Sequence, residues 1–178
     1  MAIGFSCNLA SAFTTAFSRR WGEGRGSTVT VVLRDVLGIP VWCFGYFLAV
    51  RAPSSVLFQP TMVTKVAGWL MITAGGGIIL VAIATIRFRA AKPSIQDTLV
   101  QSGIYAHVRH PIHTGTFLEF VGLFLVAPTL TVALACALGI VWVLVQSRLE
   151  EIDLIQRLPN YCEYMDAVPR FLPRFRMR

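Results

Sequence analysis

Side chains that could do chemistry gather in two short stretches of this chain. One is residues 99–115, read LVQSGIYAHVRHPIHTG, which hold all three histidines of the protein together with Tyr105 and Arg109. The other is the acidic pair Glu150 and Glu151. Arg and His side chains bind carboxylates or phosphates, and Tyr stacks on rings or hydrogen-bonds to them. The two acids could bind a cationic group. Together the two stretches therefore predict a pocket suited to a zwitterionic or sulfonium-bearing ligand.

Simpler interpretations exist for both stretches. His107, His110 and His113 lie at i, i+3 and i+6, from which a metal could be bound by one helical face. Because Pro111 interrupts that spacing and no acid or cysteine lies close in sequence, no metal site is expected. The Arg-His-Pro segment also suits an interfacial anchor that meets lipid headgroups. The acidic pair would complement a helix dipole if it lay at a helix start.

The composition indicates a membrane protein. Of the 178 residues, 55% are hydrophobic and only 14% are charged, whereas a soluble domain usually carries about 25% charged residues. The net charge of +7 would suit a nucleic-acid-binding protein, but the basic residues flank apolar segments. That placement is typical of membrane topology and of contact with anionic headgroups, so membrane lipids and not nucleic acids are the expected partners.

The apolar pattern predicts an all-α, polytopic membrane protein with about four transmembrane helices. The candidate spans are residues 28–50, 63–86, 114–127 and 129–146, and the last two form a hairpin that turns at Pro128. The Gly75-Gly76-Gly77 run predicts close helix packing. Residues 1–27 are expected to form an interfacial or flexible segment, with a glycine-rich linker at 21–27, and residues 28–178 a single membrane domain.

Mixed polarity after the last span predicts a cytosolic C-terminal helix that ends at Pro159. Basic residues cluster at 19–25, 87–92, 107–110 and 170–178. An even number of spans puts all these clusters on one side, so the positive-inside rule predicts that both termini are cytosolic. In a bacterium the protein would lie in the inner, cytoplasmic membrane.

Two ordered motifs resemble a known superfamily. Residues 103–115, GIYAHVRHPIHTG, are similar to the G-x-Y-x-x-x-R-H-P-x-Y-x-G signature of the isoprenylcysteine carboxyl methyltransferase and phospholipid methyltransferase superfamily. Residues 150–154, 161–164 and 168–173 resemble its E-E-x-x-L, Y-x-x-Y and V-x-R-x-x-P ending. The resemblance covers about residues 65–175. The chain departs from the pattern at His113, usually Tyr, at Asp97, often His, and at 158–160, where F-G is usual.

The resemblance implies a helical membrane enzyme that uses S-adenosyl-L-methionine, held by the segments 97–115 and 146–173. The residues implied in cofactor binding are Asp97, Thr98, Leu99, Val100, Gly103, Tyr105, Arg109, His110, Pro111, Ile112, His113 and Glu150. Arg148, Glu151 and His113 are the implied catalytic residues. The implied acceptor is lipophilic, either an isoprenylcysteine-like carboxylate or a lipid amine.

These two acceptors make different demands on the site. A carboxylate is already anionic and needs only an Arg to orient it, whereas an amine needs a base such as His113 or Glu151. Two further alternatives remain: a non-catalytic protein of the same fold that acts as a partner in a redox or respiratory assembly, and a protein with a His-ligated haem or metal. The oligomeric state is not predicted.

Overall fold

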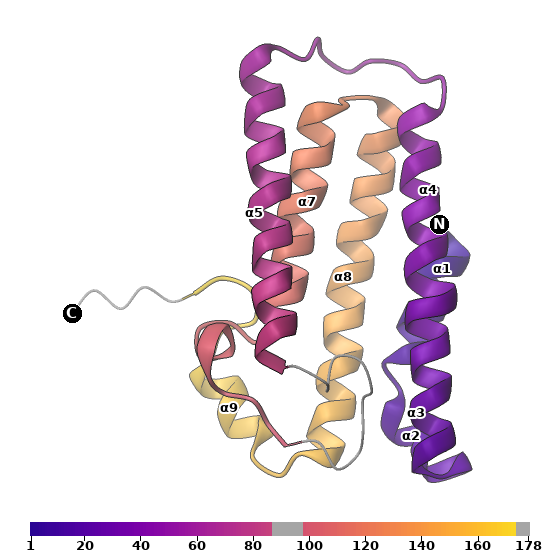
Figure 1. The fold of residues 1–178 in the computed structure, drawn as a ribbon, viewed down its shortest axis with the longest axis vertical. Helices are drawn as coiled ribbons and strands as arrows, with labels where there is room; N and C mark the ends of the chain where they lie inside the picture. Colours follow the sequence, from indigo (N-terminus) through magenta and orange to yellow (C-terminus); the bar gives the residue numbers. More distant parts are fainter. Residues whose placement is uncertain (87–97, 174–178) are drawn as a thin grey trace, which may run out of the picture.

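The chain folds into an upright bundle of helices. A computed structural model describes residues 1–86 and 98–173, and in it four long helical elements stand side by side (Figure 1). Three of them are long and apolar enough to cross a membrane, and one is shorter. The prediction of an all-α polytopic membrane protein is therefore confirmed. The elements are α3–η1–α4 (Glu23–Val31, Val32–Gly38 and Ile39–Arg51), α5 (Met62–Ile86), α7 (Pro111–Val126) and α8 (Leu130–Arg157).

The first of these elements contains a π-helical stretch, η1. Pro40 lies two residues after its end and has no N–H to donate to a carbonyl in the preceding turn. π-Helices are rare and occur mostly as short bulges inside α-helices, as η1 does between α3 and α4. Arg34 and Asp35 lie in η1 and form an ion pair at 2.7 Å.

The connections α4–α5 and α7–α8 lie at the same end of the bundle and are hydrogen-bonded to each other (Figure 1). Leu57 N–H donates to the carbonyl of Pro128 at 2.8 Å, and Leu130 N–H donates to that of Ser55 at 2.9 Å. The Thr131 hydroxyl donates to the carbonyl of Ala49 at 3.0 Å. These bonds join the α7–α8 hairpin to α4 at the end opposite the polar segments.

Helices α5 and α7 approach each other closely at paired glycines. A Cβ built on Gly75 would lie 2.5 Å from the carbonyl oxygen of Gly115, and one built on Gly115 would lie 2.5 Å from the carbonyl oxygen of Gly75. Since any side chain at either position would push the helices apart, glycine is required on both sides. The prediction that the 75–77 run serves helix packing is confirmed at Gly75, whereas Gly77 faces open space.

Helix α1 (Ala2–Ser11) completes the apolar core between α4, α7 and α8. Phe5 stacks on Trp142 with ring centroids 5.0 Å apart and on Trp42 at 6.0 Å. Deeper in the same core, Tyr46 stacks on Phe120 at 5.2 Å. The N-terminal helix is thus a packed part of the bundle, running beside α4 (Figure 1).

Residues 21–27, where a glycine-rich linker was expected, are helical except for Gly22. Helix α2 (Thr14–Trp21) ends where the linker was expected to begin, and α3 starts two residues later. Gly22, with φ at +81°, makes the turn between them. Gly26 lets the two helices touch, because a Cβ there would lie 2.5 Å from Cα of Ser18. These glycines serve a tight helical hairpin, which their number alone did not reveal.

Helix α8 continues without a break from the apolar span into the acidic segment. The sequence suggested two elements there, but Leu130–Arg157 is one helix of 28 residues, ending just before Pro159 as predicted. It therefore places Glu150 and Glu151 on the same rigid rod as the membrane span. The short helix α9 (Tyr161–Ala167) follows it.

Candidate functional site

Glu151 lies at the centre of a buried cluster of charges. Its carboxylate accepts from Nη2 of Arg109 at 3.0 Å and from both Nε and Nη2 of Arg170. Nε2 of His110 lies 3.3 Å from the same carboxylate. A third guanidinium, that of Arg148, lies at 3.7 Å. Because Glu151 has so many cationic partners, we infer that its carboxylate holds other segments of the chain in place.

Arg109 connects this cluster to the segment around α9. Its Nη1 donates to the carbonyl oxygens of Met165, in the last turn of α9, and of Val168, just after it. Main-chain bonds run in parallel, since the N–H groups of Arg109 and His110 donate to the carbonyls of Pro169 and Arg170. Three segments that are far apart in sequence, around residues 109, 151 and 168, are therefore fastened together.

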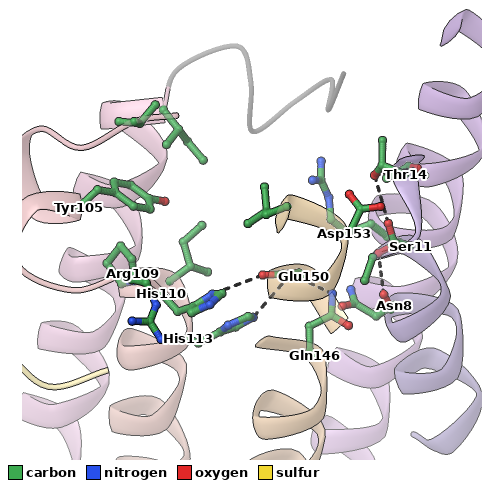
Figure 2. A pocket seen from close by; sticks show the side chains of 18 of the residues that line it. Asn8, Ser11, Thr14, Tyr105, Arg109, His110, His113, Gln146, Glu150 and Asp153 are labelled. Atoms are coloured by element: carbon green, nitrogen blue, oxygen red, sulfur yellow. Dashed lines mark hydrogen bonds and ion pairs between the residues drawn. The ribbon is translucent and has the colours of Figure 1, made fainter. Parts of the chain in front are cut away.

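Glu150 points in a different direction from its neighbour, because successive residues of an α-helix diverge by about 100°. In Figure 2 it reaches from α8 toward the two histidines. One carboxylate oxygen lies 3.5 Å from Nδ1 of His110, and the other lies 4.0 Å from Nε2 of His113. Gln146, one turn earlier, donates to it at 2.9 Å. The Glu150 side chain is 35% exposed, against 2% for Glu151.

His110 and His113 stack with ring centroids 5.3 Å apart, at the start of α7. Pro111 between them occupies the first turn of that helix, where its missing N–H costs no hydrogen bond. Burial on its own lowers the pKa of His110, but its hydrogen bonds with Glu150 and Glu151 outweigh that effect and raise the pKa above its ordinary value. Nδ1 of His113 is buried and has no hydrogen-bond partner among the described residues.

A cavity of about 370 Å³ lies between this cluster and the N-terminal helices. Its volume is within the range of small-molecule sites, roughly 300–1,000 Å³. Most of the predicted cofactor-binding residues line it. They are Thr98, Leu99, Val100, Tyr105, Arg109, His110, Pro111, Ile112, His113 and Glu150.

Three of the predicted site residues that the structure describes do not line the cavity. Gly103 and the predicted catalytic residues Arg148 and Glu151 are not among the described residues that line the cavity. Gly103 has φ at +58° and begins the short helical turn η2 (Gly103–Ala106), so its role is in the backbone. The Arg148 side chain is 65% exposed. Asp97 lies outside the described residues.

The family of the chain follows from its sequence over the same region. Residues 63–158, more than half of the chain, match the family model described as "Phospholipid methyltransferase". The chain belongs to this family. Comparison with curated proteins and with solved structures finds no significant match. Family membership agrees with the superfamily suggested by the two motifs and supports methyltransferase activity on a lipid-like acceptor.

One wall of the cavity lies outside the matched phospholipid methyltransferase region. It is built by residues of α1 to α4, and in Figure 2 Asn8, Ser11 and Thr14 lie beyond Gln146 and Asp153 of α8 as seen from the histidines. Asp153 of α8 holds this wall in place, since its Oδ1 accepts from the N–H of Thr15 at 2.9 Å. Sequence reasoning missed these residues.

Two patterns in the sequence could have revealed that wall. Gln146, Glu150, Asp153 and Arg157 recur at intervals of four, three and four, which places them on one face of a helix. Asn8 and Ser11 lie one turn apart in a mostly apolar segment, and the structure buries both. Buried polar side chains in a small protein need partners, which indicates that this face meets another polar element or a ligand.

Proposed function

We propose that this family member is an S-adenosylmethionine-dependent methyltransferase that acts on a lipid amine at the cytosolic face of the membrane. The observation that carries the proposal is the shared cavity, which brings residues of both sequence motifs to one wall beside Glu150. Family membership supplies the reaction class.

The side chains that line the cavity suit S-adenosylmethionine. A carboxylate (Glu150) is available for an ammonium group, and an aromatic ring (Tyr105) with the apolar side chains of Leu99 and Val100 is available for a nucleoside. Oε1 of Gln146 is a buried acceptor without a partner among the described residues, as Nδ1 of His113 also is. Buried polar atoms that lack partners in a protein often mark a place where a ligand or water supplies the missing bond.

We assign the following roles on that basis. Glu150 binds the amino group of the methionine end of the cofactor, and Gln146 orients the Glu150 carboxylate. Tyr105, Thr98, Leu99, Val100 and Ile112 enclose the adenosyl group. Arg109 and His110 act through the Glu151 cluster to hold this wall in position. Glu151 and Arg148 thereby become positioning residues, and His113 keeps its place among the catalytic candidates.

When bound, S-adenosylmethionine supplies an electrophilic methyl group on a positively charged sulfur. The chain's own residues then have to align the acceptor and exclude water, and alignment alone is worth ~7–11 kcal/mol in well-oriented systems. An amine acceptor must also lose a proton. His113 is suited to take it, because its ring lies on the cavity wall, is buried and leaves Nδ1 without a partner among the described residues.

The shape of the cavity supports a lipophilic acceptor. Beside the polar groups around Glu150 it is lined by Ile39 and Trp42 of the candidate span Glu23–Arg51 and by Trp142, about two turns from Glu150 along the candidate span Leu130–Arg157. An acceptor can therefore place its head near His113 while its tail meets aromatic rings. Helices α2 and α3, which carry Arg19, Arg20 and Arg25, lie at the end of the bundle where α8 ends (Figure 1), and the positive-inside rule makes this the cytosolic end.

Calorimetric titration of detergent-purified protein tests cofactor binding. We expect micromolar binding of S-adenosylmethionine and of its demethylated product, and loss of that binding in Glu150→Gln. Glu163→Gln, an exposed acid on α9, is the matched control and should bind as the unchanged protein does. Absence of binding to the unchanged protein would refute the proposed function.

A labelling experiment tests the acceptor. Membranes that contain the protein are incubated with methyl-labelled cofactor, and the labelled product is treated with base. Label on an N-methyl group survives, whereas label in a methyl ester is released as methanol. Base-labile label would replace the lipid amine by a carboxylate acceptor, and absence of any transfer despite cofactor binding would favour the non-catalytic alternative.

A further inference from the structure

His110, His113 and Glu150 each offer one ligand atom, and these atoms all lie within 4.8 Å of one another. Nδ1 of His110 lies 3.5 Å from Oε2 of Glu150, and Nε2 of His113 lies 4.0 Å from Oε1 of the same carboxylate. In a tetrahedral zinc site with bonds of about 2.0–2.1 Å, ligand atoms are separated by roughly 3.4 Å. We propose that these three side chains bind a Zn²⁺ ion.

The surrounding hydrogen bonds orient the ligands for a metal. Nε2 of His110 lies 3.3 Å from Oε1 of Glu151 and keeps its proton there, so that release of the Nδ1 proton to solvent on metal binding leaves the Nδ1 lone pair facing Glu150. This carboxylate–histidine arrangement is the one that metal-ligating histidines commonly use to fix their tautomer. Gln146 holds the Glu150 carboxylate in the same way, donating at 2.9 Å. Glu151 and Gln146 thus hold two of the three ligands in position by hydrogen bonds.

The chemistry and the access also favour zinc. Two imidazoles and one carboxylate suit Zn²⁺ and related transition metals better than Mg²⁺ or Ca²⁺, which prefer oxygen ligands. Both histidines are 7% exposed, so the site is sheltered. All three ligands line the cavity, which leaves a fourth position open to a small molecule. His113 makes the set complete, because the usual Tyr of the superfamily signature would not provide an imidazole.

A zinc ion here would compete with the cofactor. Glu150 cannot bind both a metal ion and the amino group of S-adenosylmethionine, so Zn²⁺ would act as a reversible inhibitor of cofactor binding. The metal site rests on geometry alone, and only this competition rests on the proposed function.

Metal binding is measured on detergent-purified, chelator-stripped protein at pH 8, by titration with ZnCl₂ and by metal analysis after desalting. We expect one zinc ion per chain. His113→Tyr should weaken binding at least ~100-fold, beyond the ~10–100-fold typical of losing an outer partner. His107→Ala, an exposed histidine outside the cluster, is the control and should leave zinc affinity unchanged. No zinc in the unchanged protein, or equal affinity in His113→Tyr, would overturn the site.

A second titration separates this proposal from the proposed function. S-adenosylmethionine is titrated into the protein with EDTA and, separately, with saturating Zn²⁺. The expected result is cofactor binding in EDTA and an apparent Kd at least tenfold higher with zinc. Cofactor binding without any zinc binding would overturn the metal site alone, and zinc binding without cofactor binding in EDTA would overturn the proposed function alone. Binding of both with an unchanged Kd would overturn the competition.

Discussion

Replacement of Glu151 by Gln should destabilise the protein strongly without removing a group from the cavity. Glu151 is buried among Arg109, Arg170 and His110, so its neutral amide would leave the buried guanidinium of Arg109, and the partly exposed guanidinium of Arg170, without their counter-charge. Loss of one partner from a buried ion pair costs about 3–5 kcal/mol. For a chain of this length each kcal/mol corresponds to a change in melting temperature of about 2–4 °C, which gives a decrease of roughly 6–20 °C.

The assay is thermal unfolding in detergent, followed by circular dichroism and repeated with cofactor. Glu150→Gln is the matched comparison, because it makes the same chemical change one residue away on a side chain that is 35% exposed. We expect Glu150→Gln to change the melting temperature little and to abolish the stabilisation by S-adenosylmethionine. Glu151→Gln should melt early but still be stabilised by the cofactor at low temperature. A normal melting temperature for Glu151→Gln with lost activity would refute the structural role and restore Glu151 as a catalytic group.

Two further predictions concern how the helices are held. Gly75→Ala should destabilise the protein by about 1–3 kcal/mol, because the new Cβ would lie 2.5 Å from the Gly115 carbonyl, whereas Gly77→Ala, with open space around it, should be neutral or slightly stabilising in the same melting assay. Asp153→Asn should weaken the bond from the Thr15 N–H and loosen the N-terminal hairpin, which trypsin would report as faster cleavage between residues 19 and 25. Asp166→Asn, at an exposed acid, should leave the cleavage rate unchanged, and equal rates in both variants would contradict this attachment.

The bundle itself could be predicted because its signals are local. Apolar stretches long enough to span a bilayer, Pro111 at a helix start and Pro159 after a helix end each act within a turn or two of where they stand in the sequence. The N-terminal helices were harder to predict, because the signal there is a contact between residues and not a local pattern. Gly22 and Gly26 are usually read as signs of flexibility, and only the contact with Ser18 explains why a glycine is needed at position 26.

The division of labour between Glu150 and Glu151 could not be predicted from their positions. As neighbours on one helix they differ only in the direction in which they point, and that direction has meaning only when the partners are known. The partners of Glu151 are 42 and 19 residues away along the chain, and no local pattern pairs them. A carboxylate that meets two guanidinium groups is neutralised and unavailable to a ligand, whereas Glu150 meets Gln146 and the two histidines beside an open cavity and remains available to a cation. Identical side chains one residue apart therefore acquire opposite uses, one holding the fold and the other facing the ligand.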